Sequence, residues 1–225
     1  MKTPTKLLDP MASSHRILSN ESELTLNAIV LAGGQSSRMG QDKAFVQVDH
    51  MPMLLHVCTV ARQCTDTVYV VTPWVERYQN LVGDLVQFIP EQTSSDEFLA
   101  QHGPLVGFAQ GLAHVQSEWV LLLACDLPYL QAEVLQEWMT FLPEVDETTV
   151  ALLPRHPQGW WEALCGFYRR RCLESLEAFI PEGGRSFQRW LSHQPIQEIP
   201  LFDPQMLFNC NTPNDIKKAE EQLAN

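Results

Sequence analysis

The chain has 225 residues and a formal net charge of −12, and 45% of its residues are hydrophobic. This length and hydrophobic content are typical of a globular domain with a substantial core. The negative charge argues against nonspecific binding to a nucleic-acid backbone, which needs clustered Lys and Arg, so any anionic ligand must be held by local cations.

The remaining global features predict one domain in a cytoplasmic protein without a membrane partner. The six cysteines form no C-x-x-C pair and no zinc-type cluster with His, and most lie in apolar segments, which indicates reduced thiols. The longest unbroken apolar run, Trp119 to Cys125, is too short to span a bilayer. Residues 1–25 lack the apolar centre of a signal peptide and predict a flexible N-terminal extension before a single domain over residues 26–225.

The stretch from Leu26 to Lys43 reads LNAIVLAGGQSSRMGQDK and predicts a buried strand followed by a glycine-rich turn. The apolar run ends at Gly33-Gly34, and mostly small or polar residues follow up to Gly40. Such a turn lets backbone N–H groups approach phosphate closely, and Arg38 and Lys43 add positive charge beside them. The stretch therefore predicts a nucleoside triphosphate site, with a turn kept only for its geometry as the alternative.

Spacing excludes two common phosphate-binding motifs. The P-loop needs Lys directly after its last glycine and then Ser or Thr, whereas Gln41 and Asp42 separate Gly40 from Lys43 here. The dinucleotide fingerprint G-x-G-x-x-G does not fit the adjacent glycines of this chain.

The stretch resembles instead the signature L-A-G-G-x-S-x-R-M-G-x-D-K-A of molybdenum cofactor guanylyltransferases, a branch of the sugar-nucleotidyltransferase-like proteins. Every fixed position of that signature is present from Leu31 to Ala44. The resemblance implies a single three-layer α/β domain with a mostly parallel, twisted, Rossmann-like sheet flanked by helices. It also implies that the backbone of Leu31, Ala32, Gly33 and Gly34 binds the nucleotide.

The segments that follow alternate between extended and helical patterns. We expect an extended segment at 44–49, a helix from residue 52, a strand at 67–71, a helix at 75–82 and a strand at 86–89. Strands separated by helices form βαβ units, whose ligands lie beyond the carboxyl ends of the strands. Gly33, Thr72 and Glu91 fall at such ends. Glu91 also stands where the family usually has an Asp that contacts the guanosine, so the resemblance carries that role to Glu91.

Three glycines recur four residues apart in the next predicted helix. Residues 92–102 are polar and predict a surface loop able to close over substrate, and the helix then begins at Gly103-Pro104. Gly103, Gly107 and Gly111 share one face, which favours close packing against the sheet. The resemblance adds a second role, because G-P-L-x-G follows the nucleotide loop in the family and helps to shape the base pocket.

An aspartate follows the most strongly predicted strand, which covers Trp119 to Ala124 and runs into the sequence CDLP. A carboxylate at the end of a buried strand needs a partner, and a Mg²⁺ ion bound by Asp126 and triphosphate oxygens is a suitable one. Capping of the helix near Gln131 is the alternative, for which Asp126 lies early. In the family the aspartate of C-D-x-P is the magnesium ligand, and Mg²⁺ is the cofactor that the resemblance implies.

The next part of the chain predicts a strand at 149–153 and a loop with Arg155, His156 and the pair Trp160-Trp161. Two adjacent exposed tryptophans are costly, so we expect both to pack beneath the loop, and a face for a flat ligand is the alternative. The segment WEALCGFYRR resembles the family's Q-P-L-C-A-x-Y-R but has Glu162-Ala163 where Gln-Pro is usual.

The arginine run from Arg169 to Arg171 is expected to begin a solvated helix, which continues over 173–180. A turn at 183–186 then leads into an amphipathic helix with Phe187, Trp190 and Leu191. Arg185 and Arg189 on this turn and helix are candidates to receive the phosphate of the acceptor.

The segment FNCNTPND near the C-terminus resembles the family's N-x-N-T-P-x-D. Thr212, Pro213 and Asp215 have the pattern of a helix N-terminus. Capping does not explain Asn209 and Asn211, which are left as candidates to contact the substrate or the metal.

The resemblance implies transfer of GMP from GTP to the phosphate of molybdopterin that carries molybdenum, with release of pyrophosphate. Such a reaction depends on positioning and charge neutralisation more than on acid–base groups. Arg38 and Lys43 would neutralise the triphosphate, and Asp126 would hold magnesium. Transient contact with proteins that deliver or accept the cofactor is a further implication.

Other functions stay open at this point. Cytidylyl relatives usually have A-A-G where this chain has Ala32-Gly33-Gly34, which favours guanine. A cytidylyl- or sugar-phosphate nucleotidyltransferase remains an alternative, as does a nucleotide-binding or cofactor-binding module without turnover. Retention of both Lys43 and Asp126 argues against the last of these, because binding alone does not require the metal carboxylate.

Overall fold

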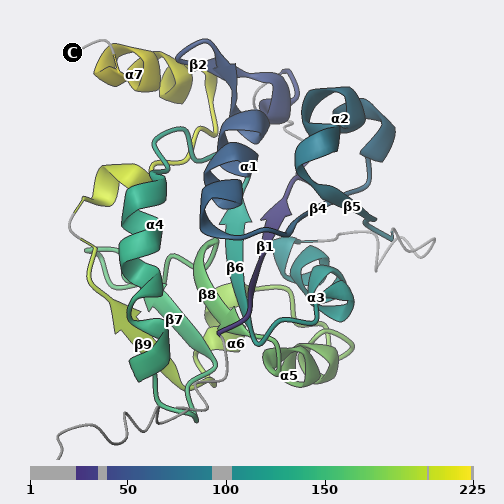
Figure 1. The fold of residues 1–225 in the computed structure, drawn as a ribbon, viewed down its shortest axis with the longest axis vertical. Helices are drawn as coiled ribbons and strands as arrows, with labels where there is room; N and C mark the ends of the chain where they lie inside the picture. Colours follow the sequence, from purple (N-terminus) through teal and green to yellow (C-terminus); the bar gives the residue numbers. More distant parts are fainter. Residues whose placement is uncertain (1–23, 35–39, 93–102, 202, 224–225) are drawn as a thin grey trace, which may run out of the picture.

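The computed structural model describes residues 24–34, 40–92, 103–201 and 203–223. Its main sheet has seven strands in the order β5-β4-β1-β6-β8-β7-β9 (Figure 1). The strands are β1 Leu26–Leu31, β4 Val68–Thr72, β5 Gln87–Pro90, β6 Trp119–Ala124, β7 Ala151–Pro154, β8 Cys165–Arg169 and β9 Ile196–Ile199, and a separate hairpin pairs β2 Gln47–Val48 with β3 Met51–Pro52.

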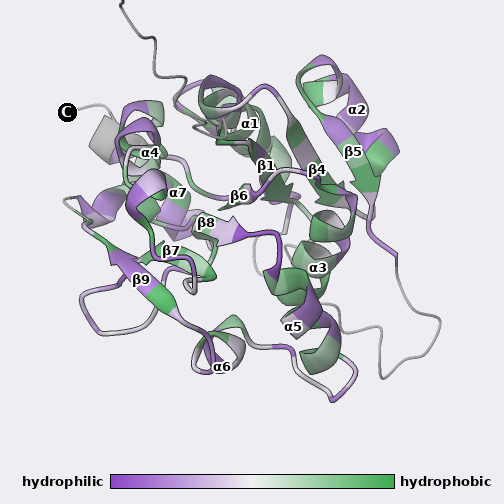
Figure 2. Ribbon diagram, turned by 60° about the horizontal axis from the view of Figure 1, so that its bottom comes forward, coloured by the Kyte–Doolittle hydropathy of each residue, from purple (hydrophilic) through white to green (hydrophobic). Residues whose placement is uncertain are grey.

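The helices are α1 Met53–Cys64, α2 Val75–Val82, α3 Pro104–His114, α4 Ala132–Met139, α5 Cys172–Phe179, α6 Phe187–Leu191 and α7 Pro213–Leu223. Side chains of α1, α2 and α4 pack on one face of the sheet, and those of α3, α5 and α6 pack on the other. Figure 2, which turns the molecule by 60°, shows these helices above and below the sheet. The expected three-layer α/β architecture is therefore confirmed.

Strand β1 lies at the centre of the parallel part of the sheet. It pairs in parallel with β4 through Ala28 and Val68, and with β6 through Leu31 and Ala124. Its residues from Ala28 to Val30 have no exposed surface, as expected for a strand covered on both faces. The strand order reverses at β1, because the chain runs outward to β4 and β5 and then returns to β6 on the other side. This switch point is where open α/β sheets bind ligands.

The expected N-terminal extension, residues 1–25, lies outside the described residues except for its last two. Leu24 packs against the core, and the backbone carbonyl of Thr25 accepts a hydrogen bond from Trp119 N. The described domain thus already includes these two residues. Among the helices of the described chain, none is both long and apolar enough to cross a membrane.

The prediction that Arg169 to Arg171 begin a solvated helix is wrong for Arg169. This residue ends β8, a strand antiparallel to both β6 and β7 that the sequence patterns did not indicate. Its guanidinium lies 4.3 Å from the Trp119 ring, pairs with Glu118 and donates to Thr149 O. Burial of a cation is tolerated here because an aromatic face, a carboxylate and a carbonyl all receive it.

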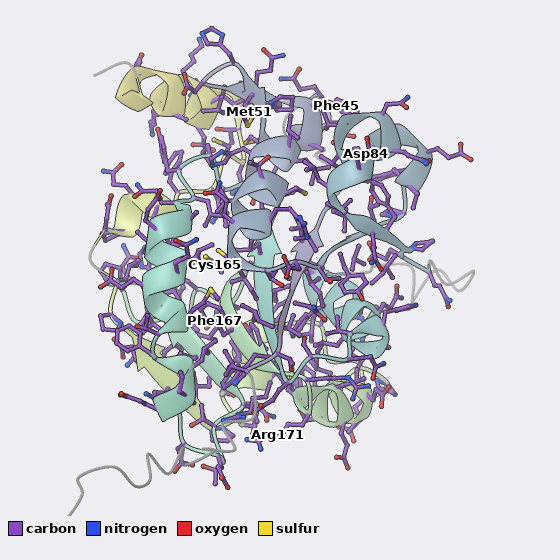
Figure 3. The ribbon with its side chains drawn as sticks, in the orientation of Figure 1. Phe45, Met51, Asp84, Cys165, Phe167 and Arg171 are labelled. Atoms are coloured by element: carbon purple, nitrogen blue, oxygen red, sulfur yellow. The ribbon has the colours of Figure 1, made fainter. Side chains whose placement is uncertain are left out.

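The antiparallel direction of β8 also places this arginine run far from the candidate site. Figure 3 shows Arg171 near the bottom of the molecule, whereas the arrowheads of β1 and β6 in Figure 1 point toward the top. Cys165 and Phe167 lie on β8 in the interior, as Figure 3 shows, and both are buried. All six cysteines are free thiols, as predicted.

Candidate active site

A cavity of about 440 Å³ lies at the carboxyl ends of β1, β4, β5 and β6. The glycine-rich turn forms one wall, the start of α3 a second, and the residues after β6 a third. Most of the residues that the sequence singled out line it: Leu31, Ala32, Gly33, Gly34, Lys43, Glu91, Gly103, Gly107, Asp126 and Asn211. The volume is in the range of small-molecule and cofactor sites.

Lys43 joins two parts of the chain that are far apart in sequence. Its Nζ donates to Asp126 Oδ2 at 3.1 Å and to Asn211 Oδ1 at 2.5 Å. The side chains of Lys43 and Asp126 are only 18% and 15% exposed, so this ion pair is shielded from solvent more than a surface pair. The predicted cation and the predicted metal carboxylate therefore face the same cavity.

A second network fixes the turn that carries Lys43. Asp42 caps the short 3₁₀ turn Lys43–Phe45 by accepting from Ala44 N at 3.1 Å. The same carboxylate accepts from Tyr78 Oη at 2.9 Å and from Arg77 Nη1 at 3.0 Å. Helix α2 thus anchors the segment in which Lys43 lies. The extended segment expected here is confirmed only at β2, because the cap turns the preceding residues into the 3₁₀ turn.

Glu91 lies between two glycines of the cavity wall. A Cβ at Gly33 would overlap Glu91 Oε2, and a Cβ at Gly107 would lie 3.5 Å from Oε1. The carboxylate accepts no hydrogen bond from the described residues, and its burial raises its pKa. Gly33 therefore makes room for this carboxylate, whereas a side chain at Gly107 would meet it only at ordinary van der Waals distance.

The three glycines of α3 have different neighbours. A Cβ at Gly111 would lie 3.0 Å from side-chain atoms of Ile29 and Val71, so this glycine brings α3 close to β1 and β4. Gly103 and Gly107 line the cavity instead. The prediction of close packing on the sheet is thus confirmed for Gly111, and the role of Gly103 and Gly107 in a base pocket stays a prediction.

The surroundings of Asp126 fit a Mg²⁺ ion whose remaining ligands are phosphate oxygens and water. Asp126 Oδ1 makes no hydrogen bond to any residue that the structure describes, while Oδ2 pairs with Lys43. In the same part of the chain, no three His, Cys, Asp or Glu side chains gather to hold a metal. One carboxylate with room for triphosphate oxygens and water is a common arrangement for Mg²⁺ in nucleotide enzymes.

Not every candidate is among the described residues that line this cavity. Arg38 and the loop 93–102 fall outside the described residues. Asn209 lines a different cavity, next to the first one. Arg185 donates to Ile180 O at 2.8 Å, and the Arg189 guanidinium lies 5.7 Å from the Phe179 ring, so neither is directed to the main cavity.

The hydrogen-bonded pair Asp42 and Tyr78 was not among the sequence-based candidates. Asp42 and Tyr78 both line the cavity, and Tyr78 is almost fully buried. Asp42 belongs to the glycine-rich signature, but sequence alone does not show which helix its side chain meets. The contact with Tyr78 depends on the packing of α2 beside the turn.

Comparisons with known proteins show the family of the chain. The sequence model described as "MobA-like NTP transferase domain" matches residues 28–197. A "Probable molybdenum cofactor guanylyltransferase" from Nostoc sp. is 60% identical over 191 residues, which are 85% of this chain and 88% of the relative. The chain belongs to the MobA-like NTP transferase family, in its branch of molybdenum cofactor guanylyltransferases. It is a nucleotidyltransferase.

More distant members of the family extend the likeness. A molybdenum cofactor guanylyltransferase from Vibrio cholerae is 30% identical over 84% of this chain and 88% of its own length. The crystal structure of a molybdopterin-guanine dinucleotide biosynthesis protein A from Archaeoglobus fulgidus has a TM-score of 0.70 at 24% identity, and covers 88% of this chain and 98% of that one. The shared fold of the MobA-like transferases supports the architecture described above.

Proposed function

We propose that the chain transfers GMP from GTP to the phosphate of molybdopterin that carries molybdenum, and so forms molybdopterin guanine dinucleotide and pyrophosphate. The names of relatives at up to 60% identity support this reaction. The observation that carries the proposal is the contact of Lys43 with both Asp126 and Asn211 inside the cavity behind the glycine turn. A cation next to a carboxylate in a cavity that the glycine turn also lines supports the proposal, because a magnesium–triphosphate complex needs both groups.

The proposed roles follow from the chemistry of each group. The backbone from Leu31 to Gly34 holds the nucleotide, and Glu91 accepts hydrogen bonds from the guanosine. Lys43, with Arg38 from the same signature, neutralises the triphosphate and the charge that develops on it. Asp126, which shares Lys43 as a partner with Asn211, would hold Mg²⁺, and the ion would supply neutralisation of phosphate charge.

The proposed reaction needs little acid–base catalysis from the protein. The acceptor phosphate is already ionised, and pyrophosphate is a good leaving group once its charge is neutralised. Orientation of the two substrates is therefore the main task of the chain. We place the reaction in the cytoplasm, since six free and mostly buried cysteines suit a reducing compartment.

The direct test is to incubate the purified chain with Mg²⁺, molybdopterin carrying molybdenum, and either GTP or CTP, and to measure pyrophosphate and the dinucleotide. We expect release with GTP and at least tenfold less with CTP. Release with CTP alone would replace guanylyl by cytidylyl transfer. Nucleotide binding without release in either case would reduce the chain to a binding module.

A further inference from the structure

A second cavity of about 500 Å³ lies beside the first. Strand β8 is antiparallel to both β6 and β7, so β7 runs in the direction of β6, and β9 is parallel to β7. The carboxyl ends of β7 and β9 and the amino end of β8 thus reach the edge of the sheet that holds the nucleotide cavity. The second cavity is lined from these ends, by His156 after β7, Glu162 before β8 and Leu201 after β9.

The two cavities adjoin through two segments of chain. Glu162 lines the second cavity and Leu164 the first, and Asn209 lines the second and Asn211 the first. Two residues of extended chain span at most about 7 Å. At both places the Cα atoms of residues that line the two cavities are therefore no farther apart than this, which is within the length of a short phosphate-bearing arm.

The second cavity has an aromatic wall. The rings of His156 and Trp160 stack with centroids 3.8 Å apart and planes 8° from parallel. Backbone hydrogen bonds from His156 N to Trp160 O, at 2.8 Å, and from Gly159 N to His156 O, at 2.7 Å, hold this loop. Gly159 takes a φ of +103°, which favours glycine.

Trp160 is 43% exposed, so the prediction that both tryptophans pack beneath the loop is wrong for it, whereas Trp161 is partly buried. The physical reason is the stack: His156 covers one face of the indole and leaves surface elsewhere on the ring open. A firmly held, half-exposed indole beside a cavity suits a flat ligand.

A carboxylate stands next to this aromatic wall. The Glu162 carboxylate accepts from Trp160 Nε1 at 3.3 Å and accepts no other hydrogen bond from the described residues. Its burial raises its pKa, although His156 and the bond from Trp160 act in the opposite direction. Further N–H donors are therefore needed to satisfy the ionised group. Glu162 is also one of the two positions at which the segment WEALCGFYRR departs from the pattern that it resembles, so its role does not follow from that resemblance.

We propose that the second cavity binds the ring system of the acceptor: a flat, fused heterocycle that stacks on Trp160 and donates N–H groups from an amino-amide edge to Glu162. The arm of the acceptor then passes Asn209 and brings its phosphate to Asn211. The identity of the acceptor as a pterin rests on the proposed function, whereas the ring type and edge follow from the cavity itself.

The test compares two small ligands with the same fused ring. Pterin has the 2-amino group and the neighbouring N–H, and lumazine has an oxygen in place of the amino group. Binding is measured with the purified chain by ligand fluorescence. We expect the wild type to bind pterin about tenfold more tightly, because a hydrogen bond to an ionised carboxylate distinguishes the two ligands.

Three variants locate the site. Glu162→Gln should reduce the preference for pterin to less than about twofold, and Trp160→Ala should weaken both ligands. Glu144→Gln removes an exposed carboxylate from elsewhere on the surface and should change neither. In the transfer assay, Glu162→Gln should raise the KM for molybdopterin about tenfold and leave the KM for GTP unchanged.

Unchanged pterin binding in both Glu162→Gln and Trp160→Ala would overturn the assignment. Weaker GTP binding in Glu162→Gln would overturn it too, because guanine carries the same amino-amide edge. Pterin binding that depends on Glu162 without any GMP transfer would keep the assignment and reject the proposed function. GMP transfer by Glu162→Gln with an unchanged KM for molybdopterin would keep the proposed function and reject the assignment of the second cavity.

Discussion

At the scale of single residues, the carboxylate of Asp126 should decide turnover. In the wild type, Lys43 Nζ donates to Asp126 Oδ2 at 3.1 Å. The substitution Asp126→Asn keeps the side-chain shape and an oxygen that can accept this hydrogen bond, but it removes the negative charge. We expect kcat to fall by roughly 10²- to 10³-fold, because charge stabilisation at the reacting phosphate is lost. Thermal unfolding should shift little.

The matched control is Asp84→Asn. Asp84 follows α2 in a 3₁₀ turn, is labelled in Figure 3, and also loses a carboxylate charge in this variant. It does not line the nucleotide cavity. Asp84→Asn should retain full activity, and equal activity of the two variants would remove Asp126 from the reaction.

Gly33 and Gly34 should differ in their tolerance of a methyl group. A Cβ at Gly33 meets the Glu91 carboxylate, whereas a Cβ at Gly34 meets no atom of the described residues within 4 Å. The carboxylate is the end of a flexible side chain, so Gly33→Ala should displace Glu91 rather than unfold the protein. GTP affinity, measured by calorimetry, should fall about tenfold in Gly33→Ala, as for a lost charge-assisted contact.

Gly34→Ala serves as the steric control and should bind GTP within about twofold of the wild type. Glu91→Asp, added to Gly33→Ala, withdraws the carboxylate by one methylene and should recover part of the affinity. If both alanine variants bound GTP equally well, the close approach of Glu91 to the glycine turn would have no function.

At the scale of elements, α2 should act on the reaction through the turn that it anchors. Tyr78→Phe removes the hydroxyl that donates to Asp42 at 2.9 Å but keeps the ring, which contacts Phe45 at 5.7 Å between centroids. The turn with Lys43 should then be held less firmly. We expect GTP affinity to fall roughly fivefold to tenfold, as for the loss of a hydrogen bond to a charged group.

Two comparisons separate positioning from general destabilisation. Tyr168→Phe also removes a buried tyrosine hydroxyl, which donates to Ala163 O at 2.7 Å, but lies away from the nucleotide cavity. It should lower stability without changing GTP affinity. In a Lys43→Met background, Tyr78→Phe should have no further effect on affinity, because a residue that acts through Lys43 cannot act once that lysine is absent. A full effect in that background would contradict the role.

The parallel elements were predictable because their patterns are local. The apolar run of β1, the proline and glycine boundaries of α1 and α2, and the run Trp119 to Ala124 each point to one structure. Strand β8 was not predictable in this way. This short strand lies directly between a tight turn and the arginine run. Arg169 is buried because it contacts Trp119, the first residue of β6, and Glu118, which precedes β6. Such tertiary partners leave no local signal.

The site divides along the same line. The glycine turn and Lys43 follow from one motif that resembles a known family and Asp126 from another, and the structure brings them together. The pair Asp42 and Tyr78 depends on how α2 packs, and the separation of Asn209 from Asn211 into two cavities depends on the path of irregular backbone. Neither of these can be inferred from spacing along the chain.

At the scale of the whole molecule, an unpartnered carboxylate in the nucleotide cavity should lower stability at neutral pH. Burial raises the pKa of Glu91 above its usual value of 4.5, so the folded state favours the protonated acid. Its contribution to folding is complete below the unfolded pKa and is lost as pH rises through the folded pKa. The formal charge of −12 further disfavours another buried anion.

Glu91→Gln should therefore stabilise the free protein at about pH 8 but not near pH 4, where the native Glu is protonated as well. The measurement is the free energy of unfolding in urea at both pH values, with the exposed Glu137→Gln as control. A higher free energy of unfolding at pH 8 together with weaker GTP binding would show that Glu91 contributes to ligand binding and lowers the stability of the free protein. Equal gains at both pH values would instead mean that side-chain packing, and not the buried charge, limits stability in this cavity.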